Sequence, residues 1–105
     1  MKTMKYLLPL AAIFALLPLS ESAEAYTQCQ SNVEKIWAGD GGYIWIHLTN
    51  GGSTYLAPND PNREAVIALS MTALTGSRQV IVRYAADGVS CTSTGRSDFL
   101  GMYLL

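Results

Sequence analysis

Few side chains in this sequence have the chemistry of a catalyst. His47 is the only histidine, and it falls within a stretch that predicts a β-strand. A Ser-His-Asp triad depends on geometry, which one strand histidine does not indicate. Asp40, Asp60, Asp87 and Asp98 all fall in predicted turns or at the ends of elements, where aspartate usually caps or forms a turn. We therefore expect no catalytic residues, and a small hydrolase built on His47 is the weakest functional hypothesis.

The glycines and cysteines do not predict a cofactor site. Residues 39–42 (GDGG) lack the following helix and lysine of a phosphate-binding loop. Cys29, Cys91 and a single histidine do not have the spacing of a zinc site, so we expect no metal and no cofactor. An even cysteine count in an exported chain predicts one disulfide between Cys29 and Cys91, with two free thiols as the alternative.

The first residues read as a targeting segment. Two lysines precede an apolar run at residues 6–19, and small residues at 22–25 (SAEA) suit cleavage after Ala25. The alternative is a membrane anchor, but the run is shorter than the roughly 20 residues of a span and contains two prolines. We expect residues 1–25 to be a cleaved signal peptide of bacterial Sec type, giving a secreted or periplasmic protein without a membrane attachment.

The remaining residues, 26–105, are expected to form a single domain with a small core. Small cores often need a disulfide or oligomerisation for stability. The formal net charge of the whole sequence is −1, and no block of like charges occurs. This balance argues against nucleic acid or an anionic membrane as the partner.

The predicted elements alternate in an informative order. Apolar and β-branched patterning predicts strands near residues 33–37, 43–49, 54–56, 79–84 and 98–105, and a helix at 61–75. The order β-β-β-α-β-β, mainly β with one helix, is that of a small OB-fold-like barrel. An open α+β sheet is the main alternative.

The boundaries of the helix have their own signals. Asp60 is a suitable N-cap and Pro61 suits the first helical position, because its missing N–H is not needed there. Gly76 is expected to end the helix as the left-handed residue after the last turn.

The faces of the helix are harder to assign. Ile67, Met71 and Leu74 recur at helical spacing, with small residues beside them, and no charged residue occurs between residues 65 and 77. The outer side of the helix is therefore either weakly polar or part of a subunit interface.

Aromatic side chains concentrate in the first half of the domain. In the strand at 43–49, Tyr43 and Trp45 oppose the aliphatic face, and Trp37 and Tyr55 lie nearby in the sequence. Aromatic rings stack on sugars and anchor interfaces, although they also fill the core and rim of small barrels. Tyr43 and Trp45 are the better candidates for contact with a ligand.

Three segments carry a resemblance to a known family. Residues 75–84 (TGSRQVIVRY) resemble the helix end and following strand of the B subunits of subtilase cytotoxin and typhoid toxin. Residues 100–102 (LGM) are similar to the closing strand of those subunits. Ser31 lies where they carry a serine on the first strand, although Cys29 and Gln30 replace the aromatic residue that usually precedes it.

The resemblance implies an OB-fold subunit of a five-membered ring that binds sialylated glycans and carries a catalytic A subunit. It also implies that Ser31 contacts the sialic acid carboxylate. We therefore expect an exported, non-catalytic, homo-oligomeric binding module that recognises a glycan or partner protein, with Ser31, Tyr43 and Trp45 as glycan contacts. The alternative is a stand-alone periplasmic structural or inhibitor-like domain with no small ligand.

Overall fold

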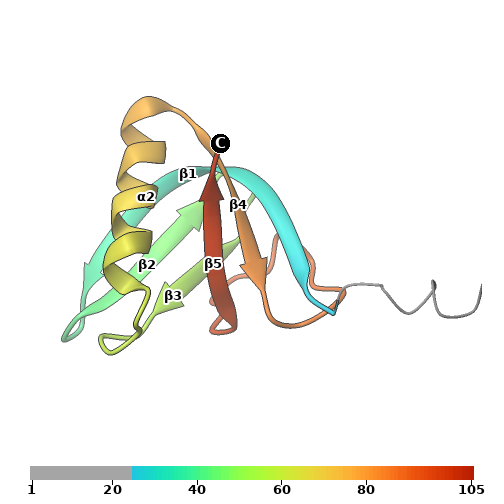
Figure 1. Ribbon diagram of the computed structural model, residues 1–105, viewed down its shortest axis with the longest axis horizontal. Helices are drawn as coiled ribbons and strands as arrows, with labels where there is room; N and C mark the ends of the chain where they lie inside the picture. The colour runs from blue at the N-terminus through green and yellow to red at the C-terminus, as the bar shows by residue number, and fades with distance from the viewer. Residues whose placement is uncertain (1–24) are drawn as a thin grey trace, which may run out of the picture.

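The computed structural model describes residues 25–105, so the predicted signal peptide lies outside the described residues except for Ala25. The elements are β1 (Thr27–Gly39), β2 (Tyr43–Leu48), β3 (Ser53–Leu56), α2 (Arg63–Gly76), β4 (Gln79–Tyr84) and β5 (Phe99–Leu104) (Figure 1). This confirms the predicted order and the mainly β class. Within residues 25–105, no helix has the length and apolar character needed to cross a membrane.

The strands form one antiparallel sheet in the order β3-β2-β1-β4-β5. The central strand, β1, pairs with β4 through its N-terminal half and with β2 through its C-terminal half. The register shifts between Val33 and Lys35. Because side chains alternate between faces, an extra residue here reverses which positions point inward. Cys29 and Ser31 are buried before the shift, whereas Ile36 packs against the core after it.

The sheet curls, but its hydrogen-bonded ladder does not close between β3 and β5. Instead, the loop before β5 bonds to the outer edge of β3. Ser53 N donates to Ser93 O at 3.0 Å, Arg96 N donates to Ser53 O at 3.0 Å, and Tyr55 N donates to Arg96 O at 3.1 Å. The closure expected of a barrel is therefore made by a loop.

Twelve buried apolar side chains make up the core within the described residues. They come from all five strands and α2: Cys29, Val33, Ile44, Ile46, Leu48, Leu56, Val66, Ala73, Val80, Val82, Tyr84 and Phe99. The inward-facing residues of β2 were expected from its alternating pattern, and the structure confirms them. In β4 the alternation buries Val80, Val82 and Tyr84.

The buried side of α2 consists of Val66, Ser70 and Ala73. These side chains are small, so the helix can approach β1 and β5 closely. The apolar stripe seen in the sequence lies mostly outside this contact, because Met71 is 53% exposed and Leu74 is 39% exposed. The side of α2 that packs on the sheet is thus the small-residue side.

The predicted N-cap of α2 is wrong. The helix begins at Arg63, and Asn62 occupies the N-cap position without a side-chain cap bond. Asp60 Oδ1 instead accepts a hydrogen bond from Asn62 N at 2.8 Å, and Arg63 N donates to Asp60 O at 3.1 Å. Asp60 therefore closes the turn that contains Pro61, so the helix starts two residues later than predicted.

The predicted C-terminal glycine is displaced by one position. Gly76 is the last residue of α2, and Ser77 adopts the left-handed conformation with φ 52°. Arg78 N donates to Ala73 O at 2.9 Å and satisfies a carbonyl at the helix end. Ser77 thus takes the left-handed position at the end of the helix, although glycine is sterically favoured there.

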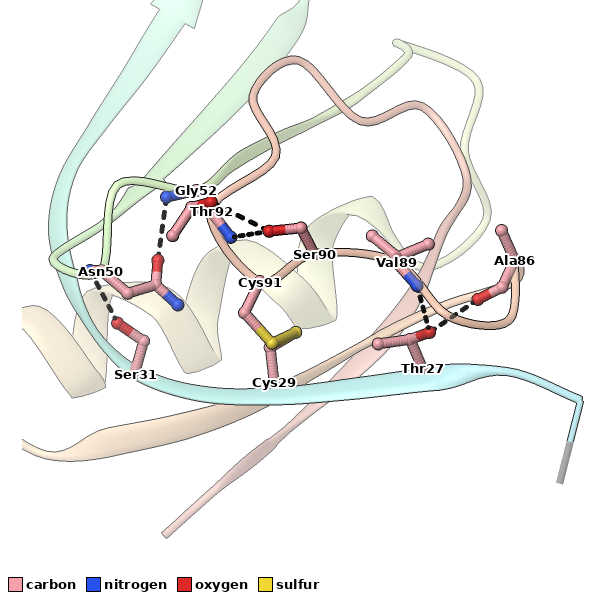
Figure 2. Close-up of a disulfide and its surroundings, with 10 residues drawn as sticks. All are labelled: Thr27, Cys29, Ser31, Asn50, Gly52, Ala86, Val89, Ser90, Cys91 and Thr92. Atoms are coloured by element: carbon pink, nitrogen blue, oxygen red, sulfur yellow. Dashed lines mark hydrogen bonds between the residues drawn. A yellow bond between two sulfur atoms is a disulfide. The ribbon is translucent and has the colours of Figure 1, made fainter. Parts of the chain in front are cut away.

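The disulfide between Cys29 and Cys91 confirms the predicted pairing, with a Cα–Cα distance of 5.6 Å. It joins β1 to the polar loop between β4 and β5 (Figure 2). Close by, Thr27 Oγ1 donates to Ala86 O at 2.9 Å and accepts from Val89 N at 3.0 Å. The long loop is therefore fastened to β1 by both covalent and hydrogen bonds.

Removing the disulfide should strongly destabilise the domain. The bridge spans 62 residues of sequence, and a loop of this length corresponds to about 4 kcal/mol in the chain-entropy model. We expect reduction, or the double substitution Cys29→Ser/Cys91→Ser, to lower Tm by roughly 15 °C or more. Reductant should not shift the Tm of the double variant further. Titration of two free thiols in native exported protein would contradict this prediction.

An ion pair organises the end of the same loop. Arg96 Nε donates to Asp98 Oδ1 at 2.9 Å and Arg96 Nη2 to Oδ2 at 2.6 Å. Ala86 N also donates to Asp98 Oδ2, at 3.0 Å. The hydrogen bonds from Arg96, aided by that from Ala86, lower the pKa of Asp98 below its ordinary value. The Asp98 carboxylate thus joins Ala86, at the start of the loop, to Arg96, which hydrogen-bonds to β3.

Asp98 should make stability depend on pH in the acidic range. Because its folded pKa is lowered, the ionised carboxylate stabilises the fold above the ordinary value of 3.8, and this contribution is lost as pH falls through the folded pKa. We expect Asp98→Asn to lower Tm by a few degrees at pH 7, with the difference from wild type narrowing on acidification. The exposed Asp87→Asn is the matched control. An equal Tm difference at pH 7 and pH 2.5 would rule out this role.

Candidate functional site

An aromatic face covers the outer side of β1, β2 and β3. It consists of Trp37, Tyr43, Trp45, His47 and Tyr55, and we refer to these residues as the aromatic face. Ladder pairing positions them, because Trp45 lies opposite Trp37 on β1 and opposite Tyr55 on β3. The inward residues of the same strand are buried, so alternation turns the aromatic side chains outward.

Trp45 is the centre of the aromatic face. Its ring centroid is 4.9 Å from that of Tyr55, and 6.2 Å from that of His47, which is nearly parallel to it. Tyr43 extends the cluster, since its centroid is 6.0 Å from that of Tyr55. Aromatic pairs at these distances stabilise one another, both across the ladder and along β2, so the rings hold one another in place.

A shallow hollow of about 350 Å³ opens on this face. It is lined by Trp37, Asp40, Trp45 and His47. Trp37 is 44% exposed, so a large apolar surface remains in contact with water. Asp40, which has a positive φ of 51° in the turn between β1 and β2, adds a carboxylate to the rim.

A glycine lies beside each tryptophan ring, but only Gly39 is needed to make room for one. The ring of Trp37 lies over Gly39, where an added Cβ would come within 2.6 Å of it. An added Cβ at Gly95, in the loop that closes the sheet, would be 3.9 Å from the ring of Trp45. The position of Trp37 therefore depends on the absence of a side chain at Gly39.

The hollow combines apolar ring surfaces with a few polar groups. Indole and phenol rings can stack on the apolar C–H faces of a sugar, and the carboxylate of Asp40 can accept hydrogen bonds from hydroxyl groups. His47 can add a donor or an acceptor. Small-ligand sites commonly have this composition of aromatic surface and convergent polar groups.

Ser31 does not lie with the other two predicted glycan contacts. It is in the N-terminal half of β1, is 5% exposed and belongs to the inward face. Its Oγ lies 3.1 Å from Thr49 Oγ1 and accepts a hydrogen bond from Asn50 N at 3.3 Å (Figure 2). In this structure Ser31 holds the turn between β2 and β3, and a contact with ligand remains a prediction.

Tyr43 and Trp45 lie on the same outward face of β2, as the sequence predicted, but only Trp45 lines the hollow, together with Asp40. Asp40 was assigned only a turn role, although its place between Trp37 and Trp45 in the sequence was a usable signal. Residues 25–105 contain no group of three or more His, Cys, Asp or Glu side chains that could hold a metal ion.

Comparison with known proteins found no protein family model, no curated protein and no solved structure that matches this chain. The geometry of the aromatic face is therefore the main basis for a functional proposal.

Proposed function

We propose that this protein is an exported, non-catalytic binding module that recognises glycans through the aromatic face. The observation that carries the proposal is the hollow between Trp37 and Trp45, with Asp40 and His47 on its rim. A stacked sugar ring would cover the exposed part of Trp37, and its hydroxyl groups would bond to the polar rim. The resemblance to toxin B subunits makes sialylated glycans the first ligands to test.

The disulfide supports the exported location in this proposal. Such bonds form and persist in oxidising compartments, such as the periplasm or the extracellular space. The Cys29–Cys91 bond together with the signal-like N-terminal sequence thus favours a secreted or periplasmic protein.

Removing either tryptophan should weaken glycan binding. We expect Trp37→Ala and Trp45→Ala each to reduce affinity by roughly 30-fold, because a central aromatic contact contributes about 2 kcal/mol. Binding of residues 26–105 would be screened on an array of neutral and sialylated glycans and quantified by calorimetry.

Two matched variants sharpen this experiment. Gly39→Ala keeps every aromatic residue but displaces the Trp37 ring, so it should also weaken binding. Leu105→Ala removes an exposed apolar side chain at the C-terminus and should have no effect. Absence of binding to any glycan, or equal binding by wild type and Trp45→Ala, would refute the proposal. Ser31→Ala in the same series tests the contact with sialic acid.

We further propose that the domain acts as a homo-oligomer, in the manner of a toxin B subunit that carries a catalytic A-type subunit or another protein. The support is the exposed side of α2, where Met71 and Leu74 face solvent and no charged residue occurs between residues 65 and 77. Exposed apolar surface of this kind is typical of protein contact sites.

The oligomer should depend on that side of α2. We expect light scattering coupled to size exclusion to give a mass above that of the monomer, and Met71→Glu/Leu74→Glu to reduce it to the monomer. Leu100→Glu, an exposed leucine outside α2, is the control and should leave the mass unchanged. A monomeric wild-type domain at high concentration would rule out assembly through α2.

A further inference from the structure

Arg83 occupies an unusual position on the outer side of the other half of the sheet, formed by β1, β4 and β5. Its Nε and Nη2 both donate to Gln28 Oε1, at 3.1 and 2.9 Å. Nη2 also donates to Tyr103 Oη at 3.2 Å. The Arg83 Cζ atom lies 4.4 Å from the ring centroid of Tyr26 and 5.8 Å from that of Tyr103. The guanidinium is therefore held in a defined orientation.

Within residues 25–105, the charge of Arg83 has no acidic partner. The only ion pair among residues 25–105 joins Arg96 to Asp98. The acceptors that hold Arg83 are a neutral amide and a phenol, and its Nη1 makes no hydrogen bond within the described part of the chain. Neutral acceptors leave the positive charge of Arg83 uncompensated, whereas a carboxylate would add Coulombic attraction to its hydrogen bonds, so this cation keeps unused capacity for an anion.

A hollow of about 190 Å³ lies beside this guanidinium. Arg83, Leu100, Gly101, Met102 and Tyr103 line it. Gly101 is paired with Arg83 across β4 and β5, and an added Cβ there would meet no atom within 4 Å. The missing side chain thus leaves space next to the cation. Leu100 and Tyr103 add exposed apolar walls.

We propose that Arg83, Tyr103 and the space above Gly101 form a binding site for a carboxylate group. One guanidinium neutralises one monovalent anion. The unused Nη1 can donate to a carboxylate oxygen, and the Tyr103 hydroxyl, which accepts from Nη2, keeps its own proton to donate. The apolar walls would contact the body that carries the carboxylate. The site is distinct from the aromatic face and does not depend on the glycan proposal.

Nuclear magnetic resonance titration of the folded domain tests this site. The probes are benzoate and glucuronate, which offer a carboxylate on an apolar ring and on a sugar, with sodium chloride at matched ionic strength as the reference. We expect saturable shifts at the amides of Arg83, Gly101 and Tyr103 with a carboxylate probe and not with chloride. Tighter binding of benzoate identifies an apolar acid as the ligand class, whereas tighter binding of glucuronate identifies an acidic sugar.

Four variants test separately the charge of Arg83, the geometry of its hydrogen-bond donors and the space above Gly101. Arg83→Gln should weaken binding roughly tenfold or more, since a charge-assisted hydrogen bond is lost. Arg83→Lys should weaken binding less, because the charge remains while the planar donors are lost. Gly101→Val should block the hollow while leaving Arg83 in place. Lys35→Gln, the control, removes a positive charge from an exposed position on β1 and should not change binding.

The outcomes are decisive even if one variant is unstable. Thermal melting would first establish that each variant is folded, and Gly101→Val is expected to fold because its side chain enters open space. Shifts that do not saturate, shifts that chloride reproduces, or unchanged affinity in Gly101→Val would overturn the proposal. Loss of affinity in Trp45→Ala as strong as in Arg83→Gln would also overturn it, because the two sites would then not be separate.

Discussion

The rest of the structure depends on β1, which both halves of the sheet share. Its N-terminal half pairs with β4 and its C-terminal half with β2, and the register shift between Val33 and Lys35 separates the two. A bulge adds one residue, increases the local twist and reverses the inward parity of the side chains. A single strand can therefore bury Cys29 and Ser31 in one half and present Trp37 outward in the other.

Because the β3–β5 ladder does not close, the loop before β5 completes the fold. Hydrogen bonds of β3 with Ser93 and Arg96, the Arg96–Asp98 pair and the disulfide hold this loop in place. The guanidinium of Arg96 also lies 5.4 Å from the ring centroid of Tyr84, whose buried hydroxyl has no hydrogen-bond partner among residues 25–105. Burial accordingly raises the pKa of Tyr84, which stays neutral in the core. In a domain with a small core, this set of contacts contributes a large share of stability.

The bend of β1 also separates two surfaces of different chemistry. One half of the sheet presents the aromatic face, where the apolar rings have a polar rim. The other half presents Arg83 with a neighbouring hollow above Gly101. In both places a glycine makes the surface available: Gly39 lies under the Trp37 ring, and Gly101 leaves space beside Arg83. A third surface, the exposed side of α2, carries Met71 and Leu74 and no charge between residues 65 and 77.

The sequence alone determined the element order, the inward face of β2 and the cysteine pair. These depend on local alternation, turn residues and cysteine count, which are readable without tertiary contacts. Tyr43 and Trp45 were also predictable as outward aromatics, because the alternation in their strand places the aliphatic residues on the opposite face. The sequence could not show which side of α2 packs on the sheet, since close approach favoured small residues over the longer stripe of Met71 and Leu74. It also could not show the bulge in β1, the burial of Ser31 or the hollow beside Arg83. Each of these depends on which strands pair and in what register, and only the tertiary structure decides that pairing, because it joins residues far apart in the chain.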